Sequence, residues 1–142
     1  MILLDTNVLS ELMRPAPDSS VLNWVDQLTI DATFISAINQ TEILQGIQLL
    51  PEGKRKQKLM QKANQMFELF KGRILPFDSE VASVFADVVV ERQKLGRAIH
   101  VQDAQIAAIA MNHNYSLATR NVKDFESIQG LEVINPWVSQ SH

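Results

Sequence analysis

The sequence contains no cysteine among its 142 residues. This absence excludes disulfide bonds, thiolate metal ligands and cysteine nucleophiles, and it favours a reducing cytoplasm as the location. Proline and glycine are scarce, at five residues each, and no stretch has the composition of an interdomain linker. We therefore expect one domain over residues 1–142, a length that can bury a core without covalent or metal cross-links.

Long apolar runs and an excess of basic charge are missing as well. No run approaches the roughly 18 apolar residues of a membrane span, and the opening MILLDTNVLSELMR lacks the basic start of a signal peptide. The net charge of −3 argues against a surface that binds nucleic acid everywhere. A dense basic segment occurs at residues 54–62, which a solvated helix face explains at least as well as a binding strip.

Short apolar segments alternate with helical patterns along the chain. Buried strands are predicted at residues 2–4, 33–35, 74–77, 115–119 and 131–134. Amphipathic stretches lie between them, and residues 81–95 show the clearest apolar repeat at intervals of three and four. This alternation predicts an α/β sandwich of three layers, in which about five parallel strands have helices on both faces.

The first predicted strand ends directly at an acid. Ligands bind beyond the carboxyl ends of the strands in an open parallel sheet, so Asp5 is the first candidate for a functional residue. A helix N-cap is the structural alternative, and the sequence leaves both interpretations open. A haloacid-dehalogenase phosphatase would need a second aspartate two residues later, where this chain has Asn7.

Three further acids are predicted to approach the same edge of the sheet. Glu42 lies in the helix after the second strand, and its alternative is an ordinary surface position. Asp103 begins a helix whose alanines allow close approach to the sheet, and its alternative is a favourable interaction with the helix dipole. Asp124 follows the strand that ends at Thr119, where a turn or cap is the alternative.

Carboxylates gathered without a lysine partner repel one another unless a divalent cation neutralises them. Mg²⁺, or Mn²⁺ in its place, prefers oxygen ligands and commonly combines one or two carboxylates with a substrate phosphate. Such an ion lowers the pKa of bound water and stabilises charge on a phosphate. The acids therefore predict phosphodiester hydrolysis. This mechanism does not require His100 or His113. Trp24 and Trp137 are interpreted as packing residues.

Several motifs resemble PIN-domain proteins of the VapC and FitB type. They are LLDTNVLSEL at 3–12, SAI at 36–38 with EI at 42–43, DA at 103–104, TRN at 119–121 and DF at 124–125. The closing Asn135-Pro136-Trp137 is similar to the FitB-like branch of the family. The resemblance covers nearly the whole chain, and the motifs together are far more specific than any one alone.

The resemblance implies a PIN fold and an Mg²⁺-dependent endoribonuclease that is the toxin of a bacterial toxin–antitoxin pair. Its implied partners are the RNA substrate, a cognate antitoxin that also binds operator DNA, and a second copy in a homodimer. Asp5, Glu42, Asp103 and Asp124 would be the catalytic acids, with Asp5 and Asp103 as the metal ligands.

The resemblance also assigns residues around these acids. Thr6 and Thr119 would orient them by hydrogen bonds, and Asn121 would either coordinate the metal through its amide oxygen or hydrogen-bond a metal-bound water. Arg120 and Lys123 are the candidate RNA contacts, with Arg14 and the segment 54–62 as more distant candidates. Some relatives carry an acid in place of Asn121, so we expect one metal ion and not two.

Two other function classes stay open at this point. A catalytically silent PIN-fold module would use its acids only as helix caps and would act by binding, although a degenerate scaffold should have lost at least one of the four acids. A phosphatase of small phosphoesters would also need Mg²⁺, but position 7 disfavours it. Apolar residues of the segment 54–70 are explained either by core packing or by an antitoxin or second copy that covers them: Met60, Met66, Leu69 and Phe70.

Overall fold

The computed structural model describes residues 1–138 and places five parallel strands in one sheet, in the order β3-β2-β1-β4-β5. The strands are β1 (Ile2–Leu4), β2 (Thr33–Ser36), β3 (Ile74–Leu75), β4 (Ser116–Ala118) and β5 (Val133–Ile134). The central strand β1 pairs with β2 on one side and β4 on the other. Segments more than a hundred residues apart in sequence therefore end side by side.

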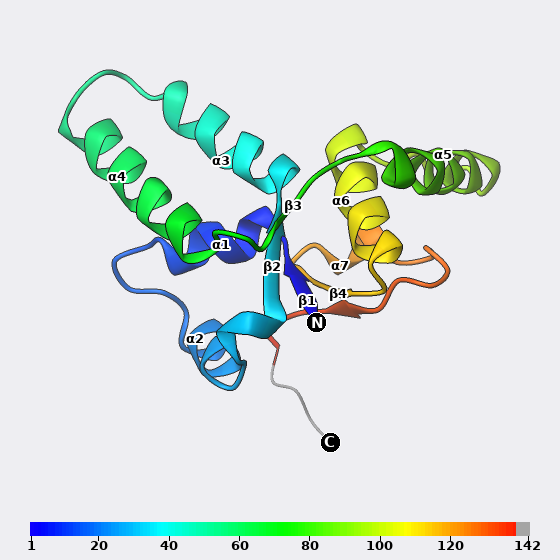
Figure 1. Ribbon diagram of the computed structural model, residues 1–142, viewed down its shortest axis with the longest axis horizontal. Helices are drawn as coiled ribbons and strands as arrows, with labels where there is room; N and C mark the ends of the chain where they lie inside the picture. Colours follow the sequence, from blue (N-terminus) through cyan, green and yellow to red (C-terminus); the bar gives the residue numbers. More distant parts are fainter. Residues whose placement is uncertain (139–142) are drawn as a thin grey trace.

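Helices connect most of the strands. They are α1 (Thr6–Leu12), α2 (Ser19–Asp26), α3 (Ala37–Gln48), α4 (Lys54–Leu69), α5 (Ser79–Lys94), α6 (Val101–Asn112) and α7 (Val122–Phe125), with a short 3₁₀ helix at Ile30–Ala32. Figure 1 shows the α3–α4 and α5–α6 pairs as two arms above the strands, with α2 below them. None of the helices within residues 1–138 has both the length and the apolar character needed to cross a bilayer.

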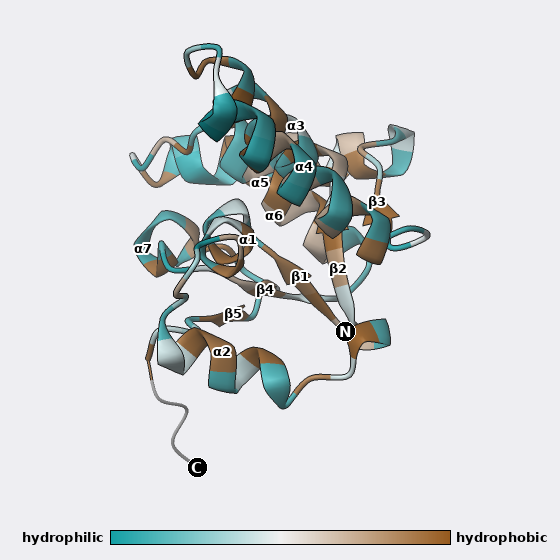
Figure 2. Ribbon diagram, turned by 90° about the vertical axis from the view of Figure 1, so that its left-hand side faces the viewer, coloured by the Kyte–Doolittle hydropathy of each residue, from teal (hydrophilic) through white to brown (hydrophobic). Residues whose placement is uncertain are grey.

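Neighbouring side chains of one strand enter different halves of the core. Leu3 and Leu117 pack with α5 and α6, whereas Leu4 and Ala118 pack with α1, α3 and α4. This division follows from the two-residue period of a strand. Figure 2 shows the strands as mainly hydrophobic, while the outer helices are of mixed character. The expected α/β sandwich with helices on both faces is confirmed.

Several boundaries differ from the sequence-based expectation, and β4 and β5 are shorter than the predicted segments 115–119 and 131–134. Strand β3 ends at Leu75 and not at Phe77, because Pro76 has no N–H group with which to continue the ladder. Helix α6 begins at Val101 with His100 as its N-cap residue, so Asp103 lies in the first turn and does not begin the helix.

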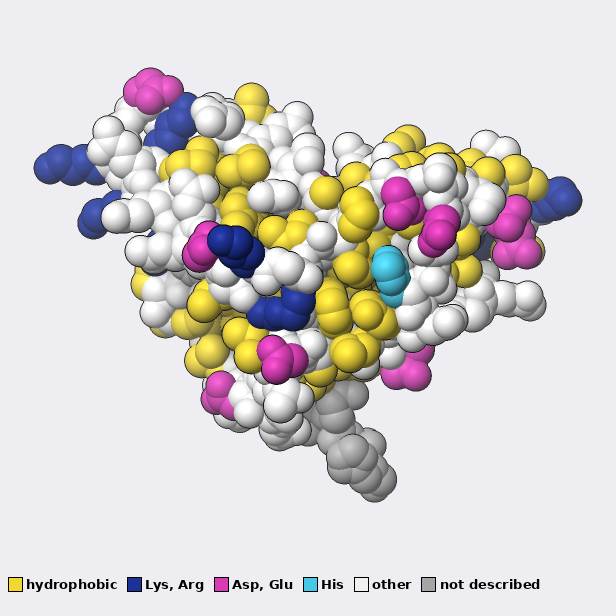
Figure 3. Space-filling view, viewed as in Figure 1, with side chains coloured by type: hydrophobic (Ala, Val, Ile, Leu, Met, Phe, Trp, Pro, Cys, Tyr) yellow, Lys and Arg dark blue, Asp and Glu magenta, His cyan; other side chains and the backbone are white. Residues whose placement is uncertain are grey.

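The apolar residues at the end of α4 divide between core and surface. Phe70 is buried, and Met60 and Met66 pack partly buried against the same core cluster, as ordinary core packing predicts. Leu69 is the exception, with 64% of its surface exposed. Figure 3 shows hydrophobic side chains at the surface between the two helical arms.

Candidate active site

The carboxyl ends of β1 and β4 bring two predicted site residues together. Leu4 is in register with Ala118, so Asp5 and Thr119 emerge next to each other. The Thr119 side chain is buried, and its hydroxyl donates to Oδ2 of Asp5 at 2.7 Å. The sheet register therefore fixes the orientation of this carboxylate.

Asp5 is both a helix cap and a buried acid. Its Oδ1 accepts from the backbone N–H of Thr6 at 2.8 Å, which makes it the N-cap of α1. Only 5% of its surface is exposed. Burial raises the pKa of Asp5 and the charge of Asp124 raises it further, against the hydrogen bonds from Thr119, Thr6 and Asn7. A cap alone does not require burial, and a buried carboxyl with a perturbed pKa is typical of a functional site.

Asn7 links α1 to the segment that follows β4. Its Nδ2 donates to Oγ1 of Thr119 at 3.1 Å, and its Oδ1 accepts from the backbone N–H of Arg120 at 3.1 Å. Oγ1 of Thr119 also accepts from the backbone N–H of Asn121 at 3.1 Å. Sequence reasoning used Asn7 only to disfavour a phosphatase and missed this role, which an amide two residues after a strand-end acid could have indicated.

Glu42 reaches the site through a shared threonine. Oγ1 of Thr6 donates to Oε1 of Glu42 at 2.8 Å and accepts from Nδ2 of Asn39 at 3.0 Å. Asn39 is fully buried, and its Oδ1 accepts from the backbone and the hydroxyl of Ser36 in the capping box of α3. Burial, then the charge of Asp5, raises the pKa of Glu42 against the hydrogen bond from Thr6.

Asp103 extends toward the same acids from α6. Burial raises the pKa of this half-buried carboxyl to about 6, and the charges of Asp5, Asp124 and Glu42 contribute, while His100 opposes the shift. None of the salt bridges within residues 1–138 includes Asp5, Glu42 or Asp103. In the part of the chain that the structure describes, these three carboxylates therefore have no salt-bridge partner.

Asp124 stands apart from the other three acids. It lies on α7, is exposed, and is not among the residues that line the depression formed by Asp5, Glu42 and Asp103. Its charge still raises the pKa values of Asp5 and Asp103. Its neighbour Lys123 also lies outside that depression.

The depression has a volume of about 490 Å³, and its lining includes residues that sequence reasoning did not place there. Glu11 and Arg14 line it from the end of α1. Trp137 packs partly against the core as expected, but it also lines the depression, where the Arg120 guanidinium lies 5.1 Å from the centre of its ring. Within residues 1–138, no group of three or more His, Asp or Glu side chains is placed so that it could hold a metal ion by itself.

Comparisons with known proteins agree with this geometry. A model of the PIN domain family matches residues 2–131. The VapC ribonuclease Y4jK of Sinorhizobium fredii is 38% identical over 96% of this chain and 98% of that protein. Toxin FitB of Neisseria gonorrhoeae is 41% identical over 96% of this chain and 99% of that protein.

A solved structure, that of FitAB bound to an IR36 DNA fragment, matches with a TM-score of 0.93 and 40% identity. The match covers 100% of this chain and 99% of the chain in that structure. With these full-length similarities and the family model, the chain belongs to the PIN domain family and resembles its VapC and FitB members throughout.

Proposed function

We propose that this chain is the toxin of a bacterial toxin–antitoxin pair and acts in the cytoplasm as a metal-dependent endoribonuclease. The observation that supports this function is the set of carboxylates of Asp5, Glu42 and Asp103, which lie together at one edge of the sheet without salt-bridge partners among the described residues. The names of the relatives, a VapC ribonuclease and the toxin FitB, point to the same activity.

The donors fit a hard divalent cation. All are carboxylate oxygens, which suit Mg²⁺ or Mn²⁺, and Mg²⁺ commonly takes one or two carboxylates together with waters and substrate phosphate. Asp5 and Asp103 would hold the ion, and Glu42 and Asp124 would complete the acidic set. A site with two protein ligands does not require three side chains that are already arranged around the metal, so the absence of such a group within residues 1–138 is compatible with it. The amide at Asn121 favours one ion over two. Such an ion, when bound, supplies positive charge at the phosphate and acidifies water.

The residues around the carboxylates keep each of them in place for this chemistry. Thr119 and the N–H of Thr6 hold the two oxygens of Asp5, and the hydroxyl of Thr6 holds one oxygen of Glu42. Oε1 of Glu42 already accepts a hydrogen bond from Thr6, so Oε2 is the better candidate to accept a proton from an attacking water. The raised pKa of Glu42 suits its carboxylate to act as this general base. Arg120, which is exposed and lines the depression, would bind RNA phosphate.

Cleavage of a mixed RNA pool tests the proposed activity. Purified protein should cut RNA with Mg²⁺ and should not do so with EDTA, and Asp5→Asn should be inactive under both conditions because it removes a metal-binding charge. The products are separated on a denaturing gel. Equal cutting by the Asp5→Asn variant would refute the mechanism, whereas no cutting of any RNA by the native chain would favour the silent binding module.

The Thr119 hydroxyl gives a second test. Thr119→Val removes the donor to Asp5 and the acceptor for Asn7, so cleavage should fall roughly 10- to 100-fold, as for other groups that orient metal ligands. Thr119→Ser keeps the hydroxyl and should retain most of the activity. The rates are measured on a fluorogenic RNA oligonucleotide at saturating Mg²⁺, and equal rates for the two variants would rule out an orienting role.

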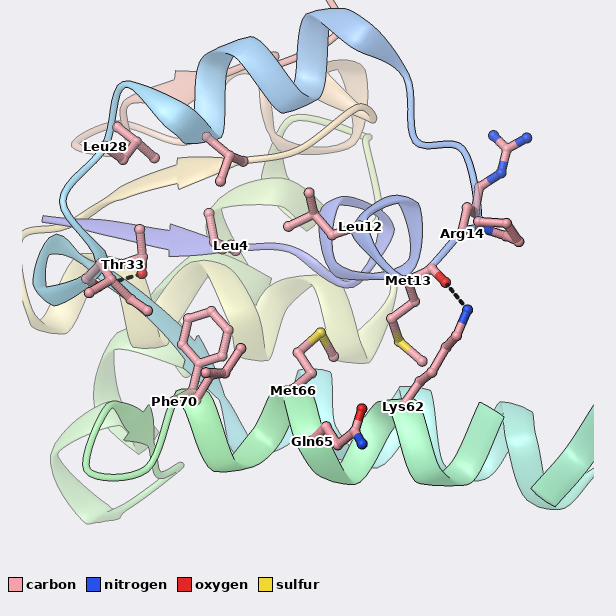
Figure 4. Close-up of a pocket in the computed structure, with 14 residues that line it drawn as sticks. Leu4, Leu12, Met13, Arg14, Leu28, Thr33, Lys62, Gln65, Met66 and Phe70 are labelled. Atoms are coloured by element: carbon pink, nitrogen blue, oxygen red, sulfur yellow. Dashed lines mark hydrogen bonds between the residues drawn. The ribbon is translucent and has the colours of Figure 1, made fainter. Parts of the chain in front are cut away.

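The proposed antitoxin needs an apolar surface to bind. A pocket of about 530 Å³ lies between α2 and α4, and its lining includes Leu28, Met66 and the exposed Leu69 (Figure 4). We infer that the antitoxin covers it, whereas a homodimer stays a separate prediction. Leu69→Glu should abolish co-purification with the co-expressed antitoxin and leave RNA cleavage unchanged. If the Leu69→Glu variant still co-purifies with the antitoxin, the antitoxin binds another surface of the protein.

A further inference from the structure

An acid outside the predicted set lies buried beside the site. Glu11 is 6% exposed and lines the same depression as Asp5 and Asp103. Its two carboxylate oxygens accept from Nη1 of Arg14 at 3.2 and 3.1 Å, and Oε2 also accepts from the backbone N–H of Asp18 at 2.9 Å. A buried carboxylate needs such partners, so the pairing fixes the position of the Arg14 side chain.

Arg14 remains accessible despite this pairing. Its side chain is 64% exposed. Only Nη1 is engaged, since Nε and Nη2 make no hydrogen bond to any other residue of the described chain. Figure 4 shows the guanidinium pointing away from the apolar pocket, and Nζ of Lys62 donates to the carbonyl of Met13 at 3.3 Å, which attaches the preceding residue to α4.

Among residues 1–138, Arg14 and Arg120 are the two cations that line the acidic depression. Arg120 is held by Trp137 and by the contact of its backbone with Asn7, as Arg14 is held by Glu11. An RNA phosphate that approaches the uncompensated acids is repelled unless cations attract it. The two arginines are the groups in this depression that can do so.

We propose that Arg14 binds an RNA phosphate adjacent to the scissile one, and that Glu11 is the positioning residue that holds Arg14 for this contact. The inference rests on the proposed ribonuclease function and assigns a substrate contact within it. An arginine presents its donors as a rigid fork. With Nη1 fixed by Glu11, Arg14 loses less side-chain entropy when it binds a phosphate in the depression than a free side chain would lose.

RNA binding tests the proposal independently of cleavage. Binding of a short fluorescein-labelled single-stranded RNA is followed by anisotropy in EDTA, over a series of salt concentrations. Arg14→Gln should weaken binding roughly tenfold, as for one hydrogen bond to a charged group, and should reduce the slope of log Kd against log salt by about 0.7. Lys71→Gln is the matched control, because Lys71 pairs with Glu68 three residues earlier in the chain, as Arg14 pairs with Glu11, but lies outside the depression. This control should change neither the RNA affinity nor the salt slope.

The positioning role is tested by a double-mutant cycle. Glu11→Gln keeps an acceptor for the N–H of Asp18 but loses the charge that holds Arg14, so binding should weaken about threefold, the effect of freeing one long side chain. Adding it to Arg14→Gln should weaken binding no further. A structural role alone would lower the melting temperature of Glu11→Gln and leave its RNA affinity unchanged, and would thereby overturn the positioning assignment.

The remaining outcomes separate this inference from the proposed function. Cleavage and RNA binding that do not depend on Arg14 would overturn the inference and leave the ribonuclease intact. Binding that depends on Arg14, in a protein that cuts no RNA, would support the contact and refute the ribonuclease. Loss of antitoxin binding by Arg14→Gln with unchanged RNA affinity would assign this arginine to the protein interface and overturn the inference.

Discussion

Replacing Asp103 by asparagine should stabilise the metal-free protein and, in the same molecule, abolish RNA cleavage. The carboxylate is half-buried beside the charges of Asp5, Asp124 and Glu42, and the amide removes the repulsion without changing the shape of the side chain. The same change removes one of the two proposed metal ligands. Cleavage should fall by more than the roughly 10- to 100-fold expected when a group that only orients a ligand is lost.

The stability gain should depend on pH in a defined direction. The pKa of Asp103 is raised from 3.8 to about 6 in the folded protein, so folding favours the protonated carboxyl. Its stabilising contribution is complete below about pH 4 and is lost as the pH rises through 6. Because the side chain is half exposed, we expect a gain for Asp103→Asn of no more than about 1 kcal/mol at pH 7.5, and almost none at pH 4.

Melting temperatures in EDTA measure this effect. Near pH 7.5 the Asp103→Asn variant should melt roughly 2–4 °C above the native chain, and the two curves should converge toward pH 4. Asp87→Asn is the matched control, since Asp87 is an exposed acid of α5 outside the depression. A variant that melts below the native chain at pH 7.5 would contradict electrostatic repulsion at this site.

The pH dependence of cleavage should follow from the same group. Protonated Asp103 cannot ligate a cation, so activity at a fixed low Mg²⁺ concentration should fall as the pH drops through about 6. Raising the Mg²⁺ concentration should move this fall to lower pH, because metal and proton compete for the same oxygens. If the pH profile does not change with the Mg²⁺ concentration, the titrating group is not a metal ligand.

The parts of the site that could be predicted are those that depend on the order of the elements and on local sequence patterns. Asp5 follows a strand directly, and the carboxyl ends of parallel strands share one edge, so its proximity to Thr119 could be predicted. The approach of Asp103 followed from the small side chains of α6, although the helix begins two residues earlier than expected. These inferences needed only periodicity and the order of elements.

The parts that could not be predicted depend on contacts between side chains distant in sequence. Asn39 is buried because it contacts Thr6 of another helix, and no local pattern indicates that contact. Trp137 reaches the depression because β5 pairs with β4, an order that the sequence leaves open. Glu11 lies on the buried side of a short helix, where an acid would usually be placed at the surface.

The position of Asp124 depends on a buried arginine that the sequence did not single out. Arg92, on α5, is 5% exposed and forms no salt bridge within residues 1–138. Its Nε donates to the carbonyl of Arg97 at 2.8 Å, and its Nη1 donates to the carbonyls of Asp124 and Glu126 at 3.0 and 3.2 Å. These last two carbonyls belong to the end of α7, where a positive charge is favourable. Arg92 thus attaches the helix that carries Asp124 to α5.

Arg92→Leu should therefore lower the free energy of unfolding by roughly 2–4 kcal/mol, because it removes the three hydrogen bonds that the buried Arg92 guanidinium makes. Urea unfolding followed by circular dichroism in EDTA measures the loss. Arg97→Gln is the matched control, since Arg97 also bonds the segment after α7, through Ser127 and Glu126, but from an exposed position where less than about 1 kcal/mol is expected. Cleavage by Arg92→Leu, assayed well below its unfolding transition, should also be reduced because Asp124 is no longer held. Equal stability of the two variants would show that α7 keeps its place without Arg92.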